Sequence, residues 1–372
     1  MSANDQLWNE AAQTIVNAGA IPFTINGTLI ELLQEMFTNE QAEFIKLFDR
    51  PSQTLEQLKE NCSMTENVLL AMLESLMQKG AVVGLPSRRT GVMVYRLLPF
   101  FPGMFEYTNF RGETSEWHKN LVRLFDRMFN ELADSNQENY DDLVELSRQL
   151  PPVPRIIPIE TEIDEPMGDK VMPAEEVSRI VDGHDYIALA NCYCRHGKDL
   201  LGEPCKVTNN KSNCFLLGKS AQFASEYNFA KLVSKDEAKK ILAEAADEGL
   251  VHKTFHIHLN PELEEEAICS CCKCCCTIFQ MYYSGAMAYH CYTNFLAVVN
   301  EDACSLCGLC FDACPMETIE ITNATAVIKE AKCIGCGVCA HQCPEGAIEM
   351  KRMDTRQVFV PPVRRDIKKN NQ

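Results

Sequence analysis

Eight cysteines near the C-terminus are spaced for iron–sulfur chemistry. The run C-x2-C-x2-C-x3-C-P occurs twice, and the second copy follows the first by 29 residues. This spacing binds two [4Fe–4S] clusters: three close cysteines hold one cluster, and the fourth, before proline, is carried across to the other. The predicted ligand sets are Cys304, Cys307, Cys310 and Cys343 for one cluster, and Cys333, Cys336, Cys339 and Cys314 for the second.

A zinc ribbon is the alternative reading of these cysteines. A zinc ribbon has two C-x2-C pairs with a longer gap between them and no cysteine–proline pair after them. Both repeats here end in cysteine–proline, so the spacing disfavours a zinc ribbon. The repeat also extends past the thiols, with matches between Gly308 and Gly337, Ile319 and Ile348, and Glu320 and Glu349. Residues 298–352 resemble the bacterial dicluster ferredoxin domain, and this resemblance implies one-electron transfer.

Further cysteines lie upstream in two groups, each at the end of a predicted strand. The candidate metal ligands are Cys192, Cys194, Cys205 and Cys214 in the first group, and Cys269, Cys271, Cys272, Cys274, Cys275 and Cys276 in the second. Neighbouring side chains on an extended chain point to opposite faces, so adjacent cysteines should serve different clusters or remain free thiols. These thiols would suffice for one or two additional iron–sulfur clusters.

Other roles are open for several of these cysteines. A structural zinc site at Cys192, Cys194, Cys205 and Cys214 is one alternative. Cys291 could be a ligand or a buried thiol, whereas Cys62, in an apolar region, is expected to be a small buried hydrophobe.

The middle region resembles that of multi-cluster ferredoxin-type proteins of anaerobic bacteria and archaea. Those proteins have a C-x-C-R motif, then a C-x-C-C-x-C-C segment, and end in a dicluster ferredoxin. The matching residues here are Cys192, Cys194, Arg195, Cys205, Cys214, Gly249–His252, Cys269, Cys271, Cys272, Cys274 and Cys275. The resemblance spans most of the chain and implies electron transfer without naming a substrate.

Histidines precede the second cysteine group. His252, His256 and His258 share one face of a strand-like run, which an ordinary half-exposed strand would explain. The functional alternative is a ligand or proton partner beside a cluster, and His252 is the best candidate for it. The chain has no G-x-G-x-x-G or C-x-x-C-H motif, so flavin, nicotinamide and haem have no support.

The apolar pattern predicts an α+β multidomain protein that positions these ligands. The expected domains are a helical, winged-helix-like domain (1–132), a proline-rich connector (133–174), a cysteine-rich cluster-binding α/β domain (175–297), a two-[4Fe–4S] ferredoxin domain (298–352) and a basic tail (353–372). In the middle domain we expect a helix over 173–181, a strand over 186–190, a helix from Ser234 to Gly249 and a strand over 251–259.

The N-terminal domain has helix signals followed by a hairpin signal. Thr54 with Gln57, and Ser63 with Glu66, form capping-box patterns that open two helices. The second helix should stop at Gly80, and a hairpin with its turn at 86–91 follows. This order, over residues 27–100, resembles a winged-helix domain. A later helix, 119–132, has an apolar stripe that must be covered by the domain itself or by a partner. The stripe consists of Leu121, Leu124, Phe125, Met128, Phe129 and Leu132.

Composition narrows the function classes. The formal net charge is −17, so we expect a redox partner protein with a basic docking patch, and nucleic acid is disfavoured. Twenty cysteines with no signal peptide favour metal ligation in a reducing cytoplasm. No apolar run reaches the ~20 residues of a transmembrane helix.

Three functions remain. The first is an electron-transfer protein, or the electron-transfer subunit of an anaerobic oxidoreductase, working as a homo-oligomer or in a heteromeric complex. The second is a redox-sensing winged-helix regulator of transcription. Its recognition helix would be acidic, which disfavours DNA binding. The third is a reductase with a substrate-binding cluster in the middle domain. An electron-transfer component is favoured over a stand-alone enzyme.

Overall fold

The computed structural model describes residues 2–19, 21, 23–87, 89–163, 175–256 and 264–365. Helices and strands are mixed, and the chain divides into two compact units. The first contains residues 1–132, 191–203 and 223–230, and the second contains residues 133–190, 204–222 and 231–372. Each unit therefore combines separate stretches of the chain, whereas the sequence analysis predicted domains that follow one another along the chain. None of the helices in the described ranges has the length and apolarity to cross a bilayer.

The first unit is mainly helical, with one small antiparallel sheet of strand order β1-β3-β2. At the start of α4, Thr54 and Gln57 form the predicted capping box. The box predicted at Ser63 is wrong, because α5 begins at Glu66 and its N-cap residue is Thr65. The elements are α1 (Ala3–Asn17), α2 (Gly27–Met36), α3 (Asn39–Ile45), β1 (Ser52–Thr54), α4 (Leu55–Glu60), α5 (Glu66–Gln78), β2 (Val82–Pro86), β3 (Met93–Leu97), α6 (Phe105–Phe110), α7 (Glu116–Glu138) and α10 (Tyr193–Leu200).

The apolar stripe of α7 belongs to the core of the first unit. The Phe105 ring lies 4.9 Å from that of Phe125 and 5.3 Å from that of Phe129, measured between centroids. Phe101 approaches Phe129 to 5.7 Å. Aromatic residues of the same unit therefore cover the stripe. The stripe gives no reason to expect a partner protein on this surface.

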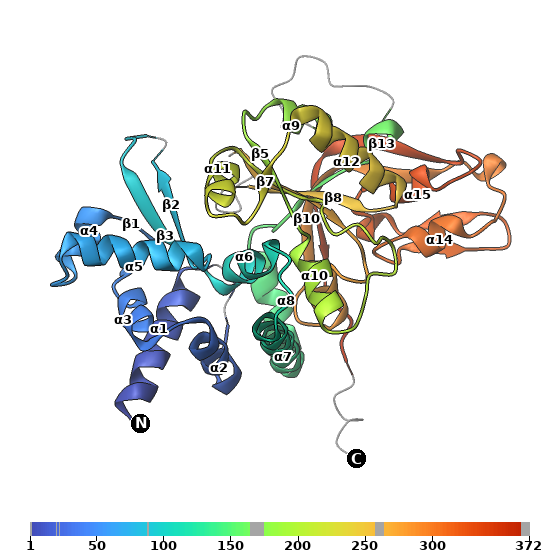
Figure 1. Cartoon of the computed structure of the whole chain (residues 1–372). Helices are drawn as coiled ribbons and strands as arrows, with labels where there is room; N and C mark the ends of the chain where they lie inside the picture. The colour runs from blue at the N-terminus through green and yellow to red at the C-terminus, as the bar shows by residue number, and fades with distance from the viewer. Residues whose placement is uncertain are drawn as a thin grey trace. The chain divides into compact units, whose positions relative to one another are not determined.

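The second unit is built on an eight-stranded sheet of order β13-β10-β4-β8-β9-β6-β5-β7 (Figure 1). The β10–β4 pair is parallel, and the other neighbours are antiparallel. The strands are β4 (Arg155–Ile157), β5 (Ile187–Ala190), β6 (Cys214–Leu217), β7 (Lys231–Leu232), β8 (Val251–His256), β9 (Glu265–Cys271), β10 (Tyr289–Val299) and β13 (Ile348–Val360). The helices are α8 (Tyr140–Gln149), α9 (Val177–Asp182), α11 (Gly218–Glu226, which continues into the first unit), α12 (Lys235–Asp247) and α13 (Thr277–Tyr283).

The two faces of this sheet have different chemistry. On one face, Phe215 of β6 and Ile268 of β9 pack with Leu242 of α12 and Ile180 of α9 in an aliphatic core. Successive residues of a strand point to opposite faces. The cysteines that alternate with Phe215 and Ile268 therefore lie on the other face, and the sheet separates them from this core.

A segment rich in cysteine is inserted between two paired strands. Val299, at the end of β10, pairs directly with Ile348, at the start of β13. We call residues 300–347 between them the cysteine-repeat insert. It contains α14 (Leu309–Ala313), β11 (Ile319–Ile321), β12 (Ala326–Ile328) and α15 (Val338–His341), drawn in orange and red-orange in Figure 1. The insert thus forms the long connection between two antiparallel neighbouring strands of the sheet.

Two segments expected to lie outside the domains are part of the sheet. The predicted connector 133–174 contributes α8 and the central strand β4, in which Ile156 and Ile157 are buried. The predicted tail 353–372 continues β13 to Val360, with Val358 also buried. Proline content and charge are local signals, whereas both strands form through long-range pairing. Pro166, Pro173, Lys368 and Lys369 lie outside the described residues.

Candidate iron–sulfur and metal sites

The first repeat forms a hollow near the protein surface. Cys304, Cys307, Cys310 and Cys343 line it, together with apolar residues such as Ile321 and Ile348. Cys307 is exposed, Cys304 and Cys343 are half-buried, and Cys310 is buried. The backbone N–H groups of Leu306 and Ala326 lower the pKa of the Cys304 thiol. Such donors stabilise a thiolate, the form that binds metal.

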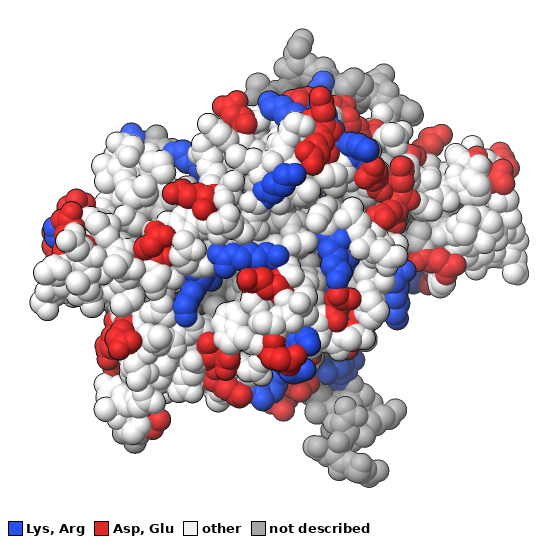
Figure 2. Space-filling view, viewed as in Figure 1, with Lys and Arg blue, Asp and Glu red and all other residues white. Residues whose placement is uncertain are grey.

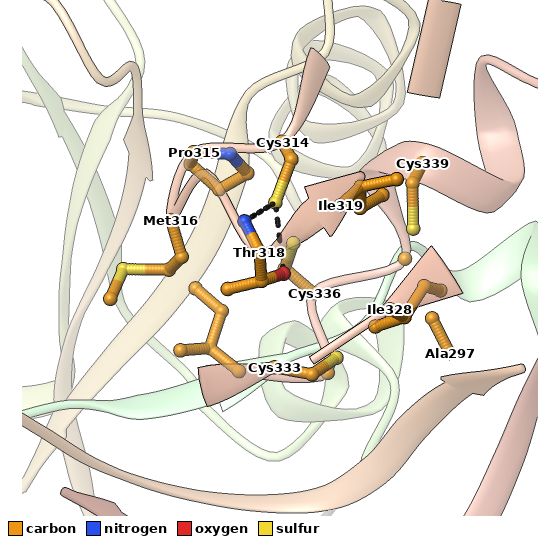
Figure 3. Close-up of a pocket in the computed structure, with 13 residues that line it drawn as sticks. Ala297, Cys314, Pro315, Met316, Thr318, Ile319, Ile328, Cys333, Cys336 and Cys339 are labelled. Carbon is orange, nitrogen blue, oxygen red and sulfur yellow. Dashed lines mark hydrogen bonds between the residues drawn. The ribbon is translucent and has the colours of Figure 1, made fainter. Parts of the chain in front are cut away.

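The second repeat forms a similar hollow whose cysteines are more deeply buried (Figure 3). Cys314, Cys333, Cys336 and Cys339 surround it. All four cysteines are buried. Burial raises the pKa values of Cys336 and Cys339 above the ordinary thiol value. A bound metal cation would offset the cost of forming a thiolate in this buried place, because a metal deprotonates the thiol that coordinates it.

Each hollow combines three cysteines of one repeat with the last cysteine of the other. This is the grouping that crossed ligation requires. Both hollows have four thiols around an otherwise apolar lining, so they fit two cubane clusters. Residues 297–350 match the family model of the 4Fe–4S dicluster domain. No curated protein and no solved structure matches the chain.

The dicluster domain has hydrogen bonds at both cysteines that precede proline. The Thr318 N–H donates to Cys314 Sγ at 3.4 Å, and the Ala347 N–H donates to Cys343 Sγ at 3.3 Å. The Thr318 hydroxyl also lies 3.3 Å from Cys314 Sγ, and both bonds are dashed in Figure 3. At the cysteines before proline the two sites therefore differ by one hydroxyl, which bears on the reduction potential of the cluster that Cys314 would help to hold.

One side chain outside the motif holds the second-repeat loop. Arg356 of β13 donates hydrogen bonds to the carbonyl of Cys333 and to those of Phe295 and Glu330, both at 3.2 Å. Sequence analysis placed Arg356 in a basic tail. Its role depends on the pairing of β13 with β10, and no local signal in the sequence indicates it.

A second group of thiols lies on the cysteine-bearing face of the sheet. Cys214 of β6 pairs in register with Cys269 of β9, so their side chains are neighbours on one face. Hydrogen bonds with the Cys269 and Cys276 thiols raise the pKa of Cys271. These four buried thiols come from β6, from β9 and from the start of α13.

A buried cation accompanies this group. Lys253 of β8 is fully buried, and its Nζ lies 3.6 Å from Cys276 Sγ and 3.6 Å from the centre of the Phe279 ring. Burial acts to lower the pKa of Lys253, but the neighbouring Cys276 raises it well above the ordinary value. A buried ammonium is costly unless it faces negative charge, so Lys253 indicates anionic sulfur here. Sequence analysis did not single out Lys253.

A third group of thiols gathers at the end of β9. The Sγ atoms of Cys205, Cys272, Cys274 and Cys275 all lie within 4.8 Å of one another. Cys271 and Cys272 belong to different groups, which follows the alternation of a strand. Cys274 and Cys275 join the same group because the chain turns at 273–275 and is no longer extended. Hydrogen bonds from Cys272 and Cys275 lower the pKa of Cys274.

Four cysteines remain to be located in the fold. Cys192 is the N-cap residue of α10 and Cys194 lies in its first turn, both in the first unit and both buried. Cys291 is enclosed in β10, where burial raises its pKa to about 12. Cys62 is half-buried, less than expected for a small core residue.

His252 does not face the cysteines of β9. It pairs in register with Ser270, on the opposite face from Cys269 and Cys271, and its Nδ1 lies 3.2 Å from Ser270 Oγ. Burial lowers its pKa to about 4, so it is a neutral core residue at pH 7. This position speaks against the alternative of His252 as a ligand or proton partner beside the β9 cysteines. The half-exposed strand expected for this run is wrong, because β8 is largely buried. His256 follows a register shift in β8, and His258 lies outside the described residues.

Proposed function

We propose that this protein is an iron–sulfur electron carrier, or the electron-transfer subunit of an oxidoreductase complex of anaerobic metabolism. It would move low-potential electrons through two [4Fe–4S] clusters in the dicluster domain. The observation that carries the proposal is the pair of hollows, each ringed by three thiols of one repeat and one of the other. The protein supplies the burial and the hydrogen bonds to sulfur that set the potentials, while the clusters supply the one-electron chemistry.

The cluster held by the first repeat would exchange electrons with a partner. Cys307 is exposed, and next to it Leu306, Leu309 and Phe311 expose 41%, 48% and 51% of their surfaces. Figure 2 shows the lobe around α14 as largely uncharged on the face in view, with acidic side chains at its margins. A partner with an apolar patch and a basic rim would suit this surface. The second cluster, whose four thiols are buried, would receive electrons from the first cluster and pass them toward the interior of the protein.

We further propose one additional iron–sulfur cluster at Cys214, Cys269, Cys271 and Cys276. Their shared face and their thiol–thiol hydrogen bonds support this ligand set. Lys253 supports it as well, since a cluster with four thiolates is anionic and a buried ammonium beside it reduces the cost of burying that charge.

The first unit would serve association in an oligomer or complex. Its helix order and antiparallel hairpin support a winged-helix architecture, the fold expected from sequence. The helix in the recognition position, α5, contains Glu66 and Glu74 and no Lys or Arg. Phosphate repulsion would oppose its entry into a DNA groove, so protein docking is the better use of this unit.

Paired cysteine variants of the full-length protein test the crossed ligation in the dicluster domain. After anaerobic purification, iron and acid-labile sulfide are counted and reduced samples are examined by redox-titrated EPR. Cys307→Ala with Cys343→Ala removes two ligands of one cluster, so only about four irons should be lost. Cys307→Ala with Cys314→Ala removes a ligand from each cluster, so about eight irons should be lost.

The two double variants are controls for each other, because each removes two thiols. The reverse pattern of iron loss would show uncrossed ligation. Wild-type protein with iron but no acid-labile sulfide, or with no one-electron EPR signal on reduction, would overturn the electron-transfer function itself.

A further inference from the structure

Four sulfur atoms meet closely at the end of β9. Cys205 Sγ lies 3.6 Å from Cys272 Sγ and 3.7 Å from Cys274 Sγ, and Cys274 Sγ lies 3.6 Å from Cys275 Sγ. Cys272 and Cys275 are buried against Ala245 and Leu250, which cover one side of the group. Three of the thiols come from one turn, and Cys205 comes from a loop 67 residues away from Cys272.

The thiols of the dicluster domain are arranged differently. They stand around hollows, and among the described residues only the Cys205 group brings four thiols within 4.8 Å of one another. In a cubane each thiolate binds a different iron, so the irons and sulfides keep the four sulfurs apart. The Cys205 group leaves no such space at its centre.

These distances suit a single tetrahedral ion. With metal–sulfur bonds of about 2.3 Å, four thiolates around one Zn²⁺ are separated by about 3.8 Å. Three of the six sulfur–sulfur separations are 3.6, 3.6 and 3.7 Å, in agreement with that value, and all six are within 4.8 Å. We propose that Cys205, Cys272, Cys274 and Cys275 bind one zinc ion as a structural site rather than an iron–sulfur cluster. This site differs from the zinc alternative considered from sequence, because only Cys205 is common to the two sets.

Zinc fits this site better than a single iron does. A four-thiolate tetrahedral set selects zinc or iron–sulfur centres, and zinc binds more tightly than Fe²⁺ at a given site. The site is closed by four protein ligands, as structural zinc sites are. Backbone N–H groups of Lys206 and Val207 donate to Cys274 Sγ and Cys205 Sγ, both at 3.5 Å, and such outer bonds orient metal ligands.

The zinc would join two segments of the second unit, one of which also contacts the dicluster domain. It would fasten the loop at Cys205 to the turn after β9. Within that turn, Lys273 forms an ion pair with Glu317 of the dicluster domain. Close by, the Tyr283 hydroxyl donates to the Pro315 carbonyl at 2.6 Å. The turn is thereby tied to the loop that presents Cys314, without contributing to either cluster.

Metal analysis of the full-length protein tests the site independently of electron transfer. Wild-type protein is reconstituted anaerobically with iron and sulfide, and metals are then measured together with zinc-edge X-ray absorption. We expect about one zinc per chain that survives reconstitution, with four sulfur neighbours at about 2.3 Å. Cys205→Ala and Cys274→Ala should lose the zinc and keep their acid-labile sulfide. Cys62→Ala, a half-buried thiol in the first unit, is the matched control and should keep both.

Four results would overturn the zinc site. Loss of about four irons and four sulfides from Cys205→Ala would indicate a cubane. One iron without sulfide at this site would indicate a mononuclear iron centre. Metal-free wild-type protein with these thiols oxidised would indicate disulfides. Zinc displaced by iron during reconstitution would mean that the ion was adventitious. The wild-type measurements decide the question even if the alanine variants fail to fold.

Discussion

At the scale of single residues, the two cysteines that precede proline in the dicluster domain differ by one donor to sulfur. Both cysteines that precede proline accept a backbone N–H from the residue four positions on, which is Thr318 in one repeat and Ala347 in the other. Only Thr318 adds a hydroxyl. A donor to sulfur stabilises the more negative, reduced cluster and so raises its potential. Near-identical motifs can therefore hold clusters of different potential.

Thr318→Val should lower the potential of the cluster bound by Cys314, Cys333, Cys336 and Cys339. The valine keeps the shape of this buried side chain and removes the hydroxyl. One hydrogen bond of about 0.5–1.5 kcal/mol corresponds to roughly 20–60 mV for a one-electron couple. Redox-titrated EPR measures the shift, with the other cluster as an internal reference. Ala347→Ser adds a hydroxyl at the equivalent position and should raise the potential of the first cluster. Unchanged potentials in both variants would contradict this account.

At the scale of elements, the repeat keeps its backbone conformation while the side chains change. Leu306 and Gly335 are equivalent, with φ of 58° and 67°, and Glu317 and Gly346 are equivalent, with φ of 51° and 57°. Since Leu306 and Glu317 adopt this conformation in the first repeat, a positive φ alone does not require glycine at these positions. Gly335 differs because a Cβ there would lie 2.3 Å from the Phe295 carbonyl oxygen and 2.5 Å from Thr293 Oγ1. Its loop packs directly on β10.

Gly335→Ala should therefore disrupt the second-repeat loop. We expect loss of about four irons and a lower melting temperature, because the backbone of β10 cannot move away as a flexible side chain could. Gly346→Ala is the matched control, since its φ is also positive and nothing lies within 4 Å of the added Cβ. It should keep its iron and lose only about 1–2 kcal/mol of stability, the usual cost of this conformation. Equal loss of iron in the two variants would show that φ, rather than the contact with β10, is decisive.

Local signals in the sequence predicted several elements well. Thr54 and Gln57 form the expected capping box, β5 and α12 lie at the expected positions, and the repeat spacing groups the eight cysteines as the hollows do. What sequence missed depends on long-range pairing. β4 lies within a proline-rich stretch, and Arg356 reaches Cys333 only because β13 pairs with β10. The turn at Cys274 broke the assumed alternation, and register alone placed His252 away from Cys269.

At the scale of the whole molecule, the second unit has a sheet that does not require the dicluster domain for its connectivity. Val299 and Ile348 lie directly opposite each other, and the next pair is hydrogen-bonded, with the Asn300 N–H donating to the Ala347 carbonyl at 2.8 Å, so a short turn could join β10 to β13 directly. The aliphatic core beneath α9 and α12 contains no residue of the insert. The Cys205 group also lies outside it. The insert does cover part of this unit: the Ile159 N–H donates to the Cys336 carbonyl at 3.2 Å, and His341 lies 3.1 Å from Asp247.

Replacing residues 301–346 with Asn-Gly, so that the hydrogen-bonded pair Asn300 and Ala347 closes the new turn, should consequently give a folded, zinc-containing protein without the dicluster iron. Asn-Gly favours the two-residue hairpin turn whose twist matches paired strands. We expect about eight fewer irons, about one zinc per chain, retained strand and helix signals in circular dichroism, and a lower melting temperature because Ile159 loses its cover. The control is the full-length chain with all eight dicluster cysteines changed to alanine, which loses the clusters but keeps the covering segment. If the shortened chain aggregates or loses its zinc while the control keeps it, the sheet needs the insert in order to fold, and the dicluster domain is a structural part of the second unit.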